Sequence, residues 1–91
     1  MFRVGELARV KATPLLANAQ FHGHVGRILK MSPISLPPEQ VADIIRAQPV
    51  YRSWLPKLNA EHGIYAAIKF TSPILGQYIW DMPLSALEAI R

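Results

Sequence analysis

Two histidines close together in the sequence are the residues best suited to metal binding. His22 and His24 flank Gly23, and imidazole nitrogens are common ligands of zinc and other transition metals. A protein metal site usually needs three or four ligands, but the sequence has no cysteine and one further histidine, His62. We therefore interpret His22 and His24 as loop residues beside a turn glycine, and we predict no metal site.

The serines and acidic residues show no pattern typical of catalysis. None of the five serines lies in a Gly-x-Ser-x-Gly elbow, which would expose a nucleophile on a sharp turn. The acidic residues are dispersed, and Glu39 with Asp43 is typical of a solvated helix face near a positive helix N-terminus. The glycines of segment 23–26 precede a strand-like sequence, whereas a phosphate-binding loop precedes a helix. We predict no catalytic residue, no cofactor, and a chain that is not an enzyme on its own.

Positive charge is concentrated near the start of the chain. The formal net charge is +4, and five Lys and Arg residues in the first thirty positions are opposed only by Glu6. Four of these cations form a candidate basic patch: Arg9, Lys11, Arg27 and Lys30. Such a patch suits an acidic protein surface or phosphate groups, and it is equally an ordinary solvated face. Because few aromatic rings lie near these cations to stack on bases, a protein partner is favoured over nucleic acid.

An aromatic group in the second half of the chain is the other candidate for binding, and it comprises Tyr51, Trp54, Tyr78 and Trp80. One interpretation is core packing, since large aromatic side chains are mostly buried. The other is a protein interface, where Trp, Tyr and Arg are enriched. The segment Val50–Leu58 follows Pro49 and contains Pro56, and in it we select as candidate partner-binding residues Tyr51, Arg52, Trp54 and Leu55.

These candidates need a framework of short β-strands to position them. The segment Leu7–Lys11 alternates, with Ala8 and Val10 on one predicted face and basic side chains on the other. The other predicted strands are Val25–Lys30, Ile64–Phe70, Gln77–Asp81 and Ala89–Arg91, with a single helical turn at Pro83–Glu88. The glycines near the first two strands are interpreted as turn residues: Gly5, Gly23 and Gly26.

The segment Ser32–His62 interrupts the β pattern and contains five of the eight prolines. We predict one short helix that Ser35 caps and that Pro49 ends, with an apolar stripe formed by Val41, Ile44 and Ile45. We predict an irregular aromatic turn after this helix, because Pro56 disfavours a long regular helix there.

The β segments carry motifs that resemble a known fold family. Phe2–Val10 has the form Phe-x-Val-Gly-acid-x-Ala-Arg-Val, and Gly23–Ile28 has the form Gly-x-x-Gly-basic-Ile. Tyr65–Phe70 follows Tyr-x-x-x-Lys-Phe, and Pro83–Glu88 follows Pro-Leu-Ser-x-Leu-Glu. Together these motifs resemble the SH3-like barrels. The likeness covers about two thirds of the chain and implies a mainly β, five-stranded barrel with a helix-containing insertion between the second and third strands.

Within this superfamily the sequence resembles three families of accessory barrels. They are the C-terminal barrel of the nitrile hydratase β subunit, the variable subunit of ferredoxin-thioredoxin reductase, and the ferredoxin-docking subunit of photosystem I. The resemblance implies a non-catalytic accessory subunit or adaptor that docks on a larger protein. From the residue types we predict that docking uses Val50–Leu58 and the basic face. Two alternatives stay open: a nucleic-acid-binding barrel of the KOW type, and a subunit that completes a nitrile-hydratase-like enzyme in trans.

The length of 91 residues fits one domain with a modest core. We expect a single SH3-like barrel domain over residues 1–91, with the insertion at about 32–62. No apolar run approaches the roughly 18 residues of a membrane span, and the first residues lack the features of a secretory signal. We therefore predict a cytoplasmic protein without membrane association, whose oligomeric state stays open.

Overall fold

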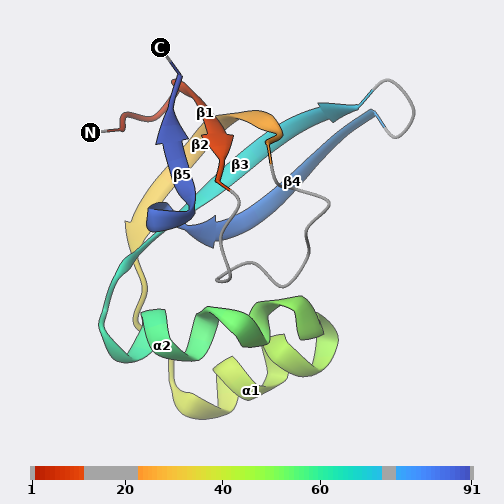
Figure 1. The fold of residues 1–91 in the computed structure, drawn as a ribbon. Coiled ribbons are helices and arrows are strands. Elements are labelled where there is room, and N and C mark those ends of the chain that lie inside the picture. Colours follow the sequence, from red (N-terminus) through yellow and green to blue (C-terminus); the bar gives the residue numbers. More distant parts are fainter. Residues whose placement is uncertain (1, 12–22, 73–75, 91) are drawn as a thin grey trace.

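The computed structural model describes residues 2–11, 23–72 and 76–90. In this part of the chain five antiparallel strands form one sheet. Two α-helices follow the second strand and precede the third in the sequence, and they lie beyond one end of the sheet (Figure 1). The strands are β1 (Leu7–Val10), β2 (Val25–Pro33), β3 (Ile64–Ser72), β4 (Gly76–Pro83) and β5 (Leu87–Ala89). The helices are α1 (Pro38–Ala47) and α2 (Leu55–Ala60), with 3-10 helices η2 (Pro49–Ser53) and η3 (Leu84–Ala86). The prediction of a mainly β fold with five strands and a helical insertion is confirmed.

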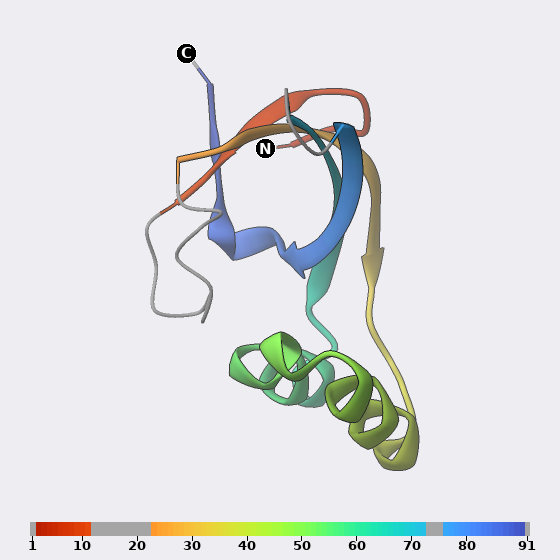
Figure 2. The ribbon, with the colours of Figure 1, turned by 90° about the vertical axis from the view of Figure 1, so that its right-hand side faces the viewer.

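The strands are hydrogen-bonded in the order β4-β3-β2-β1-β5. Every neighbouring pair in this order is antiparallel. The sheet is strongly curved, and Figure 2 shows it bending around its concave side while the helices lie beyond one end. The hydrogen-bonded order ends at β4 and β5, so the sheet is open and does not close into a barrel. No helix of the described residues is both long enough and apolar enough to span a membrane.

Side chains on the concave side of the sheet form the main hydrophobic core. The predicted alternation of the first strand is confirmed, because Ala8 and Val10 are buried whereas Arg9 is exposed. Alternate residues of β3, among them Ile68 and Phe70, are buried in the same cluster. Burial of side chains of this size stabilises the fold by about 1.5–3 kcal/mol each. The alternation therefore directs the remaining, largely polar side chains to the convex face.

A β-bulge in β2 changes the face that its later residues occupy. The register pairs Ile28 with Ile68 and then Lys30 with Ala67, so Leu29 is an extra residue between the two pairs. Strict alternation from Ile28 would direct Lys30 into the core. Because one extra residue reverses the alternation, Lys30 lies instead on the convex face.

The helical segment packs on one end of the sheet around a second hydrophobic cluster (Figure 1). Its buried residues are Ile34, Val41, Trp54 and Leu55. The predicted apolar stripe of the first helix is confirmed, since Ile44 and Ile45 pack against this cluster beside the buried Val41. The cluster also contacts Tyr65 at the start of β3, and it thereby holds the helices against the sheet.

Three predicted boundaries are wrong. Ser35 does not cap α1, because the N-cap residue is Pro37, with no side-chain hydrogen bond. The irregular turn predicted around Pro56 is replaced by η2 and α2, since Pro56 lies in the first turn of α2, where a missing N–H is tolerated. The last strand forms at Leu87–Ala89, two residues earlier than predicted, where it pairs with β1. Arg91 lies outside the described residues.

The glycines near the first two strands have different roles. Gly5 and Gly23 have positive φ angles of 94° and 82°, so their predicted turn role is confirmed. Gly26 instead lies inside β2, where an added Cβ would contact the Ile68 side chain and lie 3.0 Å from the carbonyl oxygen of Lys69. The prediction of a turn role for Gly26 is therefore wrong, because this glycine permits the close approach of β2 and β3.

Candidate functional site

The convex face of the sheet carries basic and apolar side chains in rows across the strands. The register pairs Leu7 with Arg27, Arg27 with Lys69, and Lys69 with Ile79. Directly paired residues project to the same face, so these four side chains form one row. Leu7 is 47% exposed and Ile79 is 60% exposed. Two cations are therefore flanked by an exposed apolar side chain at each end of the row.

A second row lies beside the first. Arg9 is paired with Val25 on one side and with Glu88 on the other, and all three side chains are exposed. The Nη1 atom of Arg9 is 4.0 Å from Oε1 of Glu88, which leaves this ion pair open to solvent. We refer to the following residues together as the basic-apolar face: Leu7, Arg9, Val25, Arg27, Lys30, Lys69 and Ile79.

The structure brings together three of the four residues of the predicted basic patch. Arg9, Arg27 and Lys30 lie on the basic-apolar face, and Lys11 is exposed just after β1. Arg27 donates a hydrogen bond from Nη1 to the carbonyl oxygen of Gly5 at 2.5 Å, so its guanidinium is held beside the turn that precedes β1. Since a carbonyl carries no net charge, this bond orients the guanidinium without neutralising it.

Lys30 connects this face to an acidic residue on the edge strand. Lys30 is paired with Ala67, which is paired with Asp81, so the three residues form a row across β2, β3 and β4. Burial raises the pKa of Asp81, and the positive charge of Lys30 opposes part of this rise. The Nζ atom of Lys30 also lies 5.7 Å from the ring centroid of Tyr65, which is a cation–π distance.

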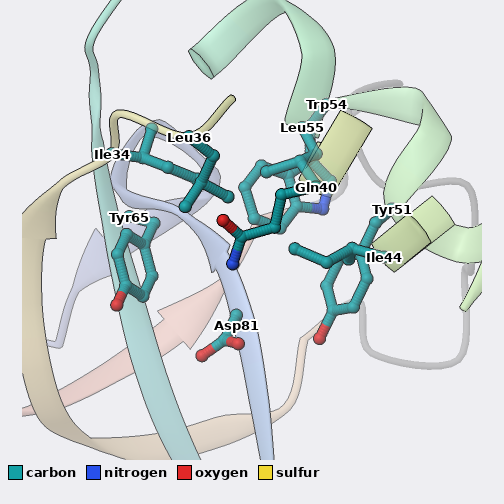
Figure 3. Close-up of a pocket in the computed structure, with 9 residues that line it drawn as sticks. All are labelled: Ile34, Leu36, Gln40, Ile44, Tyr51, Trp54, Leu55, Tyr65 and Asp81. Atoms are coloured by element: carbon teal, nitrogen blue, oxygen red, sulfur yellow. The ribbon is translucent and has the colours of Figure 1, made fainter. Parts of the chain in front are cut away.

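A solvent-open pocket of about 190 Å³ lies between the helices and the end of the sheet (Figure 3). Its apolar walls are formed by Ile34, Leu36, Ile44 and Leu55. These residues come from the β2–α1 connection, α1 and α2, so the pocket depends on the helical segment packing against the sheet. A cavity of roughly 150 Å³ accepts a benzene molecule, and this pocket therefore has room for one side chain or a small ligand.

Three aromatic residues line the same pocket: Tyr51, Trp54 and Tyr65. The rings of Tyr51 and Trp54 pack edge to face with centroids 5.4 Å apart, and Tyr51 also contacts Trp80 at 5.9 Å. Figure 3 shows the rings of Tyr51 and Tyr65 on either side of the Asp81 carboxylate. The aromatic walls are thus fixed by contacts with each other and with β4.

The polar groups of the pocket are contributed by Asp81 and Gln40. Asp81 is half-buried, and burial raises the pKa of its carboxyl above the ordinary value of 3.8. Two ion pairs within 4.0 Å occur among the described residues, and Asp81 belongs to neither. Figure 3 shows the amide of Gln40 directed toward this carboxylate. The pocket therefore presents a carboxylate in a largely apolar, aromatic setting.

The phenol of Tyr51 lies against Asp81. Burial raises the pKa of Tyr51 above its ordinary value of 10.0, and the negative charge of Asp81 raises it further, while a backbone hydrogen bond with Asp81 lowers it. A phenol with the ordinary pKa is already neutral near pH 7, and the raised pKa extends this neutral range, so Tyr51 adds no charge to the pocket.

The candidate partner-binding residues separate into two groups. Tyr51, Trp54 and Leu55 line the pocket, whereas Arg52 is exposed outside it. Trp54 is 4% exposed and Leu55 is 3% exposed, so both side chains pack mainly within the chain. This burial matches the core interpretation of Trp54. It leaves Tyr51 and Arg52 as the more accessible members of the set.

Sequence reasoning missed Asp81, Tyr65 and Lys69 as candidate site residues. Asp81 and Tyr65 lie on different strands, 16 positions apart, and only the antiparallel register of β3 and β4 brings them together. Lys69 had a usable signal, because it alternates with the apolar residues of the predicted strand Ile64–Phe70. The same alternation would have assigned Tyr65 to the face of Lys69.

Of the two neighbouring histidines, the structure describes His24. His22 lies outside the described residues, and His24 is exposed with its ring edge-on to Phe70 at 6.4 Å. Within residues 2–11, 23–72 and 76–90, no group of three or more potential metal ligands comes together.

Comparison with known proteins returned no relative for this chain. No protein-family model, no curated protein and no solved structure matches it.

Proposed function

We propose that this chain is a non-catalytic, cytoplasmic accessory subunit or adaptor that docks on a larger protein through the basic-apolar face. The observation that carries the proposal is the row formed by Leu7, Arg27, Lys69 and Ile79. Its two apolar ends are exposed to water, although each belongs to a residue type that is usually buried. A partner that covered this row would remove apolar surface from water and place acidic groups opposite the two central cations.

The composition of this face favours a protein partner over nucleic acid. Its uncharged members are the aliphatic residues Leu7, Val25 and Ile79, and the nearby ring of Tyr65 is half-buried and already lies beside Lys30, so this face offers little aromatic surface for stacking on bases. Aliphatic side chains surrounded by Lys and Arg suit an interface with an apolar centre and an acidic rim. We accordingly propose a partner whose surface combines exposed apolar groups with Asp and Glu residues.

The strand arrangement supports a proposal about the fold family as well. We propose that the curved, open sheet has the strand arrangement of the SH3-like barrels, with β1 between β2 and β5 and the short helix η3 leading into the last strand. In the families that this sequence resembles, such barrels pack on a catalytic or electron-transfer partner. An accessory role follows from that likeness only as an analogy, so the binding experiment below decides the function.

The experiment is capture of partners from extracts of the native host by the immobilised chain, with and without nuclease. Leu7→Ser/Ile79→Ser removes both apolar ends of the row, and Ile64→Ser is the matched control at an exposed apolar residue outside it. We expect the double variant to retain at most about a tenth of the partner captured by the parent, and the control to retain it fully. Circular dichroism verifies that each variant is folded.

A second pair of variants tests the charges of the row. Arg27→Gln/Lys69→Gln removes two cations from the basic-apolar face, and Arg52→Gln/Lys57→Gln removes two cations from the helical segment. The first pair should weaken capture and its dependence on salt, while the second should leave both unchanged. Equal capture by all four variants would contradict the proposal. Loss of the captured material after nuclease treatment would favour a KOW-like nucleic-acid-binding barrel instead.

A further inference from the structure

Lys30 places a positive charge near two residues that line the pocket, Tyr65 and Asp81. The ammonium group of Lys30 lies 5.7 Å from the centroid of the Tyr65 ring, and its charge also acts on Asp81. An ammonium group is attracted both by the face of an aromatic ring and by a carboxylate. Tyr65 and Asp81 line the pocket, whereas Lys30 lies outside its lining. A cation that entered the pocket would therefore contact the same two groups, the Tyr65 ring and the Asp81 carboxylate.

The remaining walls favour an occupant with an apolar stem. Ile34, Leu36, Ile44 and Leu55 supply aliphatic surface, and Tyr51 with Trp54 supplies aromatic surface. The volume of about 190 Å³ suits a single unbranched side chain or a ligand of similar size. An anion would face the carboxylate of Asp81 and would find no cationic residue among the described residues that line the pocket. A purely apolar occupant would leave that half-buried carboxylate without an ion partner within the pocket.

We propose that this pocket binds an alkylammonium group on an unbranched aliphatic stem, the chemistry of a lysine side chain, with Asp81 facing the ammonium and Tyr51 and Tyr65 flanking it. This inference goes beyond the proposed docking function, because it assigns a second site that selects the opposite charge. Basic side chains are attracted by the pocket, while acidic surfaces are attracted by the basic-apolar face. Each site is therefore testable when the other proposal fails.

Lys30 has a defined role in this site as a competing cation. Its positive charge already acts on Asp81, and its ammonium group already lies over the ring of Tyr65. A bound ammonium would be repelled by this charge across the row Lys30–Ala67–Asp81. Removal of the Lys30 charge should therefore tighten cation binding, whereas removal of the Asp81 charge should weaken it. If the pocket bound an anion instead, removal of the Lys30 charge would weaken binding and removal of the Asp81 charge would strengthen it.

Titration of the purified chain, followed by the amide signals around the pocket in two-dimensional NMR, tests the proposal. The probes are the blocked peptide acetyl-Gly-Lys-Gly-amide, the same peptide with norleucine in place of lysine, and n-butylammonium chloride. We expect the lysine peptide to bind with a dissociation constant on the order of 1 mM, and the uncharged norleucine peptide at least about tenfold more weakly. Comparable binding of n-butylammonium would identify a free amine as a sufficient ligand, and its failure would show that the peptide backbone is also recognised.

Four substitutions test the named residues. Asp81→Asn should weaken binding of the lysine peptide by about tenfold or more, and Asp43→Asn, at an exposed carboxylate on α1, should not change it. Lys30→Met should strengthen binding by about two- to fivefold at low salt. Tyr65→Phe should keep the affinity, because the ring face is retained. Since Asn and Met are close in size to the residues they replace, a loss of fold is not expected, and thermal unfolding verifies this for each variant.

Three results would overturn the inference. The first is an absence of shifts around the pocket with either cationic probe up to about 10 mM, well above the expected dissociation constant. The second is equal binding of the norleucine and lysine peptides, which would identify an apolar pocket without charge selection. The third is unchanged affinity in both Asp81→Asn and Lys30→Met. None of these results bears on capture of a partner by the basic-apolar face, so failure of one proposal is distinguishable from failure of the other.

Discussion

Asn59 and Leu36 are joined by two hydrogen bonds that connect α2 to the segment before α1. The backbone N–H of Leu36 donates to Oδ1 of Asn59 at 2.7 Å, and Nδ2 of Asn59 donates to the carbonyl oxygen of Leu36 at 3.0 Å. The side-chain amide thus pairs with the main chain as a neighbouring strand would. Because Leu36 lines the pocket, this pair fixes one of its walls.

Asn59→Ala should lower the free energy of unfolding by about 1–3 kcal/mol, since it leaves the partly buried N–H and C=O of Leu36 without these partners. Urea unfolding followed by circular dichroism measures the change. The matched control is Arg46→Ala, which removes the exposed ion pair with Asp43 and should change stability by less than about 0.5 kcal/mol. An equal effect of the two substitutions would show that the Asn59 pair does not hold the helical segment.

Gly26→Ala should destabilise the sheet by about 1–3 kcal/mol, because a Cβ at this position contacts Ile68 and lies 3.0 Å from the carbonyl oxygen of Lys69. Thermal or urea unfolding measures the loss. The double variant Gly26→Ala/Ile68→Ala should lose less than the sum of the two single variants, since removal of the Ile68 side chain makes room for the new methyl group. If the losses of the two single variants simply add, the destabilisation by Gly26→Ala comes instead from the close approach of the new methyl group to the backbone of β3.

Asp81→Asn should raise the free energy of unfolding at about pH 7. Burial raises the pKa of Asp81 in the folded state, so the protonated carboxyl is favoured there. The stabilisation that the protonated Asp81 gives the folded state is fully present below the ordinary pKa of 3.8. It is lost as the pH rises through the folded-state pKa and the carboxyl ionises. The advantage of the neutral Asn should therefore be largest at neutral pH and should shrink toward about pH 3.

Urea unfolding of both proteins across this pH range tests the prediction for Asp81, with Asp43→Asn as the control. Asp43 is exposed and pairs with Arg46, so its substitution should bring no gain at neutral pH. A less stable Asp81→Asn variant at neutral pH would show that attraction between the carboxylate and Lys30 outweighs the cost of its burial.

Trp54→Ala should lower the free energy of unfolding by about 3–5 kcal/mol, because the indole is buried in the second hydrophobic cluster and contacts Tyr51. Arg52→Ala, two residues earlier and exposed, should change it by less than about 0.5 kcal/mol. Thermal unfolding of the two variants measures the difference. Wild-type stability in Trp54→Ala would place this residue at an interface, as in the hot-spot interpretation of the sequence.

The elements with regular apolar spacing were predictable from the sequence. Ala8 and Val10 alternate with polar neighbours and are buried, and the stripe containing Val41 and Ile44 packs against the second cluster. The boundaries at proline were less predictable, because Pro56 is compatible with a helix in its first turn and incompatible with the interior. Local spacing cannot tell these two positions apart when tertiary packing decides where the helix begins.

By itself, the sequence determined the number of strands, the place of the helical insertion and the side of the first strand that enters the core. These features follow from local periodicity and from the hydrophobicity of alternate residues. Only the tertiary structure decided that Lys30 lies on the convex face, since the extra residue Leu29 depends on pairing with β3. The pairing of β3 with β4 placed Asp81 beside Tyr65, and the helices pack so that both residues line a pocket. Contacts between residues distant in the chain are set by strand register, which no local spacing specifies.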